Sequence, residues 1–167
     1  GVLAGEVVLA PEIDRVPSAW TLLSYQFLHD GWQHVLFNML FLWVFGDNVE
    51  DATGHVRFLL LYLICGAVAG LAHFAADPSS LAPLVGASGA VSGMLGAYVL
   101  LYPRARILVL AMNVIPLYLP AVVVIGVWMA QDVFWAQFGG DTGVAILAHV
   151  GGFVAGMALI RFFRRPG

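Results

Sequence analysis

Apolar residues dominate five blocks of this chain, and short polar or proline-containing stretches separate the blocks. A membrane-spanning helix needs about 20 mainly apolar residues. The pattern therefore predicts five spanning helices, at residues 33–49, 58–76, 88–102, 107–129 and 144–163. Residues 46–57, between the first two, are expected to form a polar loop.

Residues 1–31 contain no such block, because acidic side chains, Arg15 and prolines interrupt their apolar runs. Their aromatic side chains are of the kind that gathers where a membrane meets water. These are Trp20, Tyr25 and Phe27, followed by Trp32. We expect this segment to be a loop that lies on one leaflet or partly in it.

Composition agrees with a membrane protein, since 61% of the 167 residues are hydrophobic and only 10% are charged. A soluble domain carries about a quarter charged residues. The net charge of −3 leaves no basic face for nucleic acid. The one cysteine, Cys65, excludes an intrachain disulfide and a cysteine metal cluster.

Basic residues predict the orientation of the chain. All seven are arginines. If the chain crosses the membrane five times, Arg15 lies on one side of the membrane and the other six lie on the opposite side. Cytoplasmic loops carry an excess of arginine and lysine. The other six should therefore face the cytoplasm: Arg57, Arg104, Arg106, Arg161, Arg164 and Arg165.

A serine between glycines opens the third predicted span. Ser88 follows Gly86 and precedes Gly89, at or near a helix start, where free backbone N–H groups can hold an oxyanion. The alternative is that Ser88 only caps the helix and that the glycines only allow close packing.

His149 lies in the last predicted span, beside a small-residue face made by Gly152 and Gly156. Gly89 and Gly93 form a similar face next to Ser88, and two such faces let helices approach closely. A hydrogen bond between Ser88 and His149 is therefore expected. In the alternative, His149 bonds a neighbouring carbonyl and does no chemistry.

His34 and Asn38 lie four residues apart, so their side chains share one helix face and can point at one oxygen. The alternative is that the two side chains only make hydrogen bonds between helices and have no catalytic role. His29 is interpreted as a loop-packing residue, and His55 and His73 as surface or interface residues.

Three local patterns together resemble the rhomboid family of intramembrane serine proteases, and the match covers nearly the whole chain in the family's order. They are His34-x3-Asn38, Gly86-Ala87-Ser88-Gly89 and Ala148-His149-x-Gly151-Gly152-x3-Gly156. The run Gly46-Asp47-Asn48-Val49-Glu50-Asp51 also resembles the family's continuation after the first pattern.

The resemblance implies a transmembrane helical bundle that cleaves the membrane segments of other proteins near their outer ends. It implies a Ser–His dyad without a third acid, with Ser88 as nucleophile and His149 as general base. The Ser88 backbone N–H, His34 and Asn38 would form the oxyanion hole, and Gly86 would leave room for the substrate carbonyl. No metal or cofactor is implied.

Two features depart from the family's pattern. The family core has six spans, so we expect one more apolar segment upstream of residues 1–31. Some members carry a tyrosine that stacks on the base four residues after the nucleophile. This position is Ser92 here, so another group must orient His149.

The sequence therefore predicts a multi-pass intramembrane serine endopeptidase in a bacterial plasma membrane, with its site toward the outer face. A catalytically silent relative that binds membrane helices is the main alternative, and a small transporter or channel subunit is a third. Candidates for a lipid-facing aromatic gate are Phe37, Trp128, Phe134 and Trp135.

Overall fold

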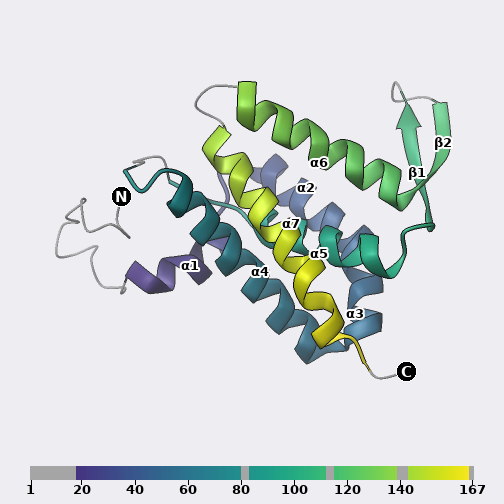
Figure 1. Ribbon diagram of the computed structural model, residues 1–167, viewed down its shortest axis with the longest axis horizontal. Coiled ribbons are helices and arrows are strands. Elements are labelled where there is room, and N and C mark those ends of the chain that lie inside the picture. The colour runs from purple at the N-terminus through teal and green to yellow at the C-terminus, as the bar shows by residue number, and fades with distance from the viewer. Residues whose placement is uncertain (1–17, 80–82, 112–114, 139–142, 166–167) are drawn as a thin grey trace.

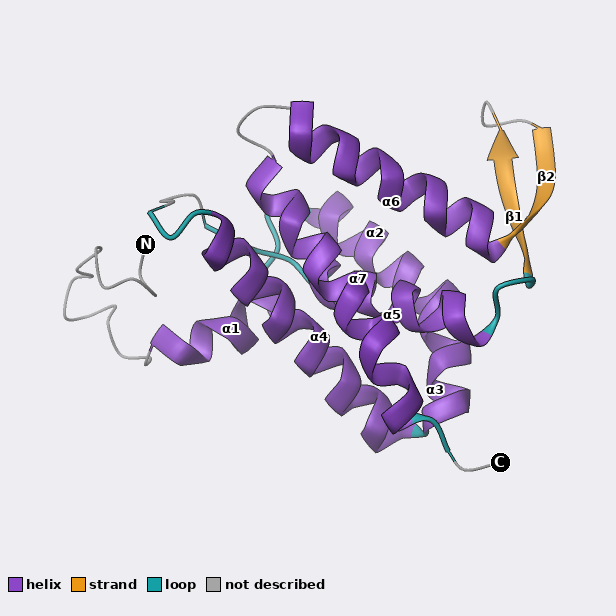
Figure 2. Cartoon of the chain, viewed as in Figure 1, coloured by secondary structure: helices purple, strands orange, loops and turns teal. Residues whose placement is uncertain are grey.

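The computed structural model describes residues 18–79, 83–111, 115–138 and 143–165. It is a helical bundle with one short antiparallel hairpin (Figure 1, Figure 2). The elements run in the order η2 (Ser18–Trp20), α1 (Thr21–Ser24), η3 (Tyr25–Phe27), α2 (Trp32–Phe41), η4 (Leu42–Gly46), α3 (Asp47–Thr53), α4 (His55–Ala76), α5 (Ser88–Leu101), β1 (Arg106–Ala111), β2 (Ile115–Pro120), α6 (Ala121–Phe138) and α7 (Gly143–Phe163).

Helix α5 is the centre of the bundle, and every residue from Gly89 to Val99 is buried. It packs most extensively against α7, and α4 packs against both. A Cβ on Gly152 or Gly156 would overlap the backbone carbonyl of Gly89 or Gly93. The two predicted glycine faces therefore meet, and the backbones of α5 and α7 come into direct contact.

The first predicted span is longer than the sequence suggested, and the predicted polar loop at 46–57 is wrong. α2, the π-helical turn η4 and α3 follow one another without a break as far as Thr53. The helix ends at Gly54, whose φ of 87° is unfavourable for residues with a side chain. Acidic residues in α3 do not end the helix, because Asp47 and Asp51 remain exposed.

The fourth predicted span, 107–129, is also wrong. Residues 106–111 and 115–120 pair as the antiparallel strands β1 and β2, in which Leu110 pairs with Pro116 and Arg106 with Pro120. Proline has no N–H to donate and disfavours helix at the residue before it. The helix in this region begins at Ala121, directly after Pro120, and α6 extends to Phe138.

Residues 18–27 form short helical turns that are held against α4. The Tyr25 hydroxyl donates to the Gly66 carbonyl at 2.7 Å, and the Tyr25 carbonyl accepts from the Gly86 N–H at 3.1 Å. Gln26 is 1% exposed and packs on Gly66. This segment therefore ties the start of the bundle to the loop before Ser88.

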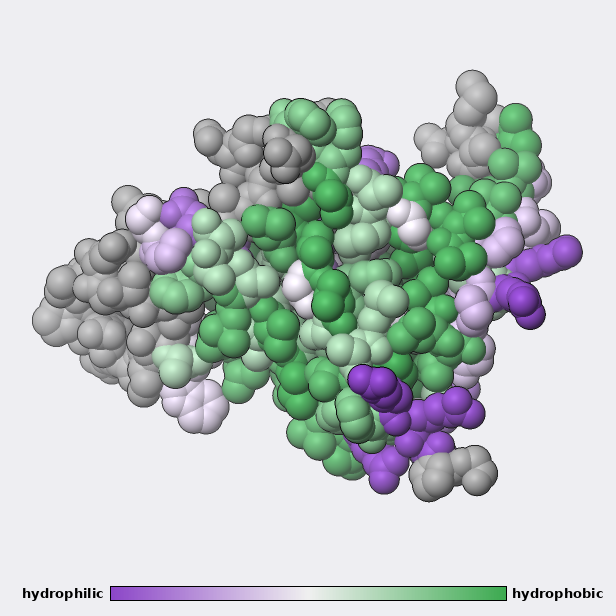
Figure 3. Space-filling model, viewed as in Figure 1, coloured by the Kyte–Doolittle hydropathy of each residue, from purple (hydrophilic) through white to green (hydrophobic). Residues whose placement is uncertain are grey.

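The outside of the bundle is strongly apolar. Trp32 and Trp43 are 89% and 75% exposed, which a lipid environment tolerates and water does not. In Figure 3, hydrophobic side chains cover the middle of the visible face, and hydrophilic ones gather at the C-terminal end of α7 and near the base of the hairpin. The fold is thus a helical membrane bundle.

Two helices of the described chain are long and apolar enough to cross a membrane: α4, and α7 from Ile146 to Phe163. α5 and residues 121–131 of α6 are apolar but shorter. The number of five spans therefore stays a prediction.

Candidate active site

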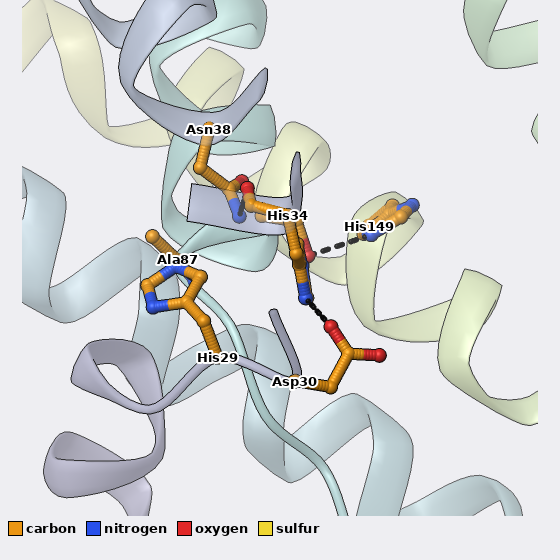
Figure 4. A network of polar contacts seen from close by, with 7 residues as sticks. His29, Asp30, His34, Asn38, Ala87 and His149 are labelled. Carbon is orange, nitrogen blue, oxygen red and sulfur yellow. Dashed lines mark hydrogen bonds and ion pairs between the residues drawn. The ribbon is translucent and has the colours of Figure 1, made fainter. Parts of the chain in front are cut away.

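Ser88 and His149 come together where α5 and α7 meet, next to the contacts between the glycines of the two helices. Ser88 is the first residue of α5, and its Oγ lies 2.9 Å from His149 Nε2 (Figure 4). The helix cap is Ala87, and no side chain caps this helix. The Ser88 hydroxyl therefore faces the imidazole, and the interpretation of Ser88 as a helix cap is wrong.

Gly86 shapes the turn that leads into Ser88. Its φ is 112°, and a Cβ at this position would lie 2.6 Å from both Cε1 and Nε2 of His34. Only glycine combines this backbone conformation with room for the ring. The His34 ring edge consequently lies directly against the loop that carries the serine.

The Ser88 backbone N–H is one of the unpaired donors at the start of α5. At this end of the helix, the Val91 N–H donates to the Ala87 carbonyl at 2.9 Å. In the part of the chain that the structure describes, no acceptor is bonded to the Ser88 N–H. This N–H can therefore bind an oxygen of a substrate.

Asn38 is 5% exposed and uses one amide hydrogen within its own helix. Its Nδ2 donates to the His34 carbonyl at 3.0 Å. An amide group carries two donor hydrogens, so one remains for another partner. His34 and Asn38 both border the cavity in front of Ser88, as expected from their spacing.

His29, interpreted above as a loop-packing residue, and Asp30, which was not selected as a candidate, also contact residues of this site. The Ala87 N–H donates to His29 Nε2 at 3.4 Å, and the ring stands edge-on to that of His34, 5.1 Å between centroids (Figure 4). Asp30 Oδ1 lies 2.6 Å from His34 Nδ1. The spacing of Asp30 and His34, one helical turn, is the signal that could have found the pair.

A cavity of about 470 Å³ opens in front of the serine. Its lining is mainly apolar, with few polar groups, as in sites that bind an extended or drug-sized ligand. The lining residues are Asp30, His34, Phe37, Asn38, Phe41, Pro83, Leu84, Val85, Ser88, Val91, Trp128 and His149. Within the described residues no three His, Cys, Asp or Glu side chains are grouped to hold a metal.

Trp128 of α6 is stacked on His149, with 6.0 Å between ring centroids and 28° between planes. The hydroxyl of Ser92 donates to the Ser88 carbonyl at 2.8 Å. The aromatic ring that stacks on His149 is therefore on α6, and not on α5, where position 92 lies.

Two of the four aromatic gate candidates line the cavity. Phe37 and Trp128 border the cavity, and Phe37 is 59% exposed. Phe134 instead packs on Phe138, with 4.9 Å between ring centroids. The side chain of Trp135 lies outside the described residues.

Residues 17–166 of the chain match the Rhomboid domain. The chain belongs to the rhomboid family. This family is integral to membranes, and the apolar surface of the bundle agrees with that location.

Curated relatives extend the comparison. Rhomboid protease GluP of Bacillus subtilis is 45% identical over 91 residues, which are 53% of this chain and 17% of GluP. Rhomboid-related protein 2 of Mus musculus is 32% identical over 167 residues, 95% of this chain and 52% of the relative. Rhomboid-related protein 1 of Caenorhabditis elegans is 31% identical over 163 residues, which are 92% of this chain and 42% of the relative. This rhomboid chain thus spans about half or less of the length of these relatives.

Proposed function

We propose that this rhomboid chain is an intramembrane serine endopeptidase with Ser88 as nucleophile and His149 as general base. The observation that carries the proposal is the 2.9 Å contact between Ser88 Oγ and His149 Nε2 at the edge of the cavity. A nucleophile and a base within hydrogen-bond distance are what acyl transfer requires. The similarity to GluP, whose name includes "rhomboid protease", adds support.

The reaction begins when Ser88 Oγ attacks the carbonyl carbon of a substrate peptide bond, while His149 Nε2 takes the hydroxyl proton. The C–N bond then breaks, and His149 returns that proton to the leaving amine. An acyl-enzyme ester on Ser88 remains. Water, deprotonated by His149, attacks the ester and releases the new carboxyl end and the free serine.

The developing oxyanion needs donors that are already in place. Three groups at the site can serve: the Ser88 backbone N–H, the second amide hydrogen of Asn38 and Nε2 of His34. All three belong to residues that border the cavity, and Gly86 keeps the space between His34 and the serine loop open.

We further propose that substrates are transmembrane proteins and that the site faces the outer side of the membrane. Ser88 begins α5, whereas Arg104 follows its end, so the two lie at opposite ends of one helix. Four arginines lie near the C-terminal end of α7 or contact it; Arg57 Nη1, for example, is 3.5 Å from the Arg164 carbonyl. Arginine-rich ends face the cytoplasm.

The nucleophile is tested with Ser88→Ala in the purified chain reconstituted into liposomes with a single-span substrate. Loss of cleavage is expected, together with loss of labelling by a serine-directed fluorophosphonate, because the attacking oxygen is gone. Ser92→Ala is the matched control, since Ser92 lies one turn later on the same helix and its hydroxyl faces the helix backbone. Both cleavage and labelling should survive in that variant.

Cleavage at wild-type rate by Ser88→Ala would refute the peptidase. A wild-type chain that binds the substrate but shows neither cleavage nor labelling would favour a catalytically silent relative. Strong chelators should leave the rate unchanged, and recovery of a chelated enzyme on addition of zinc would contradict the serine mechanism.

A further inference from the structure

A groove of about 670 Å³ runs along the C-terminal half of α7, where this helix meets the end of α5. It shares no lining residue with the cavity of the candidate active site. Leu100 of α5 and Val154 and Ala158 of α7 belong to its apolar part. Arg161 and Arg164 line the end nearest the C-terminus of α7. We propose that this groove binds one anionic phospholipid, with an acyl chain along the apolar part and the phosphate on the two arginines.

The groove residues of α7 lie on one face of the helix. Val154, Ala158, Arg161 and Arg164 follow one another at intervals of three or four residues, the spacing that places side chains one above the other. Val154 is 57% exposed and Leu100 is 49% exposed, so the apolar part is open to the surroundings of the bundle. Figure 3 shows hydrophilic side chains gathered at this end of α7, next to hydrophobic ones. An apolar surface thus leads directly to a pair of cations.

The length of the groove fits one leaflet of a bilayer. A helix rises about 1.5 Å per residue, so α7 rises about 15 Å from Val154 to Arg164. The hydrocarbon core of a bilayer is about 30 Å thick, and each leaflet supplies half of it. A lipid whose acyl chain ends near Val154 therefore has its phosphate at the level of the arginines. A free phosphate ion would leave the apolar part uncovered.

Acidic side chains do not balance the charge at this end of the groove. Within the part of the chain that the structure describes, no acidic residue lines the groove, and neither Arg161 nor Arg164 forms an ion pair. Arg57 adds a third cation, because its Nη1 donates to the Arg164 carbonyl at 3.5 Å. The carbonyls at the end of α7 offset only about half a charge. A net positive charge remains, which favours a phosphate over a neutral group.

The two guanidinium groups can bind phosphate oxygens in pairs. Arg161 Cζ lies over the ring of Phe162, 5.1 Å from its centre. A guanidinium that rests on a ring by its face keeps the N–H groups of its edge for oxygen acceptors. Arginine binds phosphate through two parallel N–H groups, whereas lysine binds it as a point charge. Both arginines are exposed, so an incoming headgroup can reach them.

The main alternative occupant is a second copy of this chain. Two copies related by an axis along the membrane normal would meet through the same surface on each. Each copy would then hold Arg161 and Arg164 at the same level in the membrane, with cation against cation. An anionic lipid covers the same apolar surface and neutralises the arginines. The lipid is therefore the occupant that the charge favours, and this inference does not depend on the proposed peptidase activity.

The headgroup is tested by native mass spectrometry of the purified chain in detergent, with equal amounts of phosphatidylglycerol and phosphatidylcholine of the same acyl chains. Wild type should retain one phosphatidylglycerol in at least about tenfold preference, and Arg161→Gln combined with Arg164→Gln should lose the preference. Arg104→Gln combined with Arg106→Gln is the matched control, because these arginines follow α5 and do not line the groove. Equal retention of both lipids by wild type, or equal loss in both double variants, would overturn the inference.

The acyl chain is tested on the wild-type chain, so that no folding defect of a variant can interfere. Phosphatidylglycerol with a diazirine on its acyl chain is placed in phosphatidylcholine nanodiscs, and the cross-linked residues are identified. Cross-links should concentrate at Leu100, Val154 and Ala158, and unlabelled phosphatidylglycerol should suppress them. Suppression by glycerol phosphate would show a site for free phosphate instead of a lipid. That result, cross-links spread evenly over the apolar surface, or a second chain seated on the groove would each overturn the inference.

Discussion

The α5–α7 seam and helix α6 border the same cavity but are held in different ways. Along the seam, Gly152 and Gly156 press on the backbone carbonyls of Gly89 and Gly93. On α6, a Cβ at Gly126 would meet nothing within 4 Å. The seam positions Ser88 and His149 through backbone contact, whereas α6 reaches the site mainly through one side chain, Trp128.

This difference matches what each region must do in the proposed reaction. A Ser–His contact of 2.9 Å requires helices that cannot slide past each other, and interlocked backbones provide that. Substrate entry requires a side of the cavity that can move. α6 packs against α7 far less than α5 does, and its apolar face is exposed, as at Val127. We therefore expect substitutions in the seam to cost stability and those on α6 to cost turnover.

The largest expected effect is on the seam itself. Gly156→Leu should lower the free energy of unfolding by more than about 4 kcal/mol and abolish cleavage, because the side chain would have to displace the α5 backbone. The unfolding midpoint in detergent and the cleavage rate measure this. Gly126→Leu on α6 is the matched control and should fold like wild type. Equal destabilisation in both variants would remove the distinction between the two regions.

The next effect, on the oxyanion hole, should appear in rate and not in stability. Asn38→Ala should lower kcat on the order of 100-fold, or about 3 kcal/mol of barrier. A hydrogen bond between membrane helices is worth about 0.6 kcal/mol, so the unfolding midpoint should change little. Kinetics and thermal unfolding in one detergent separate the two quantities.

Asn48→Ala is the control for this prediction. Asn48 makes the same kind of bond to the carbonyl four residues earlier, at 3.4 Å to Val44, but it does not border the cavity. Its kcat should equal that of wild type. If the rate loss of Asn38→Ala only follows a loss of folded protein, Asn38 is structural.

The residues proposed for the site could be selected from the sequence because each lies in a short local pattern. His34 and Asn38 share a helix face by spacing alone, and the glycines beside Ser88 and His149 indicate helices that approach closely. These features depend on neighbours within one or two helical turns. The rhomboid family and the helical membrane fold followed from the same patterns and are confirmed.

The β1–β2 hairpin could not be predicted from hydropathy, because residues 107–119 are as apolar as a spanning helix. Pro116 and Pro120 are the residues in this range that argue against a spanning helix, because proline has no N–H to donate. The helical segment at 46–53 was missed for the opposite reason, since polar residues there suggested a loop. A helix can extend beyond the apolar region when its polar side chains reach solvent.

The contact between Trp128 and His149 depends on the rotation and height of α6 against α7. No pattern within either helix records these quantities, so the sequence could show only that Ser92 leaves the stacking position unfilled. Trp128 was selected as a gate candidate, and its place on the ring of His149 is what the structure adds.

The smallest expected effect concerns this contact. A stacked aromatic pair is worth about 0.5–1.5 kcal/mol, so Trp128→Ala should lower kcat by up to about tenfold as the imidazole loses its fixed orientation. Trp128→Phe keeps a ring at the site and should retain most of the rate. Trp43→Ala is the control, because Trp43 is 75% exposed and borders no part of the cavity.

If Trp128 acted only as a barrier to substrate entry, its removal would raise kcat/KM for a membrane substrate. A lower kcat in Trp128→Ala, restored in Trp128→Phe, would instead show that the loosely packed helix helps to orient a base carried by the rigid seam.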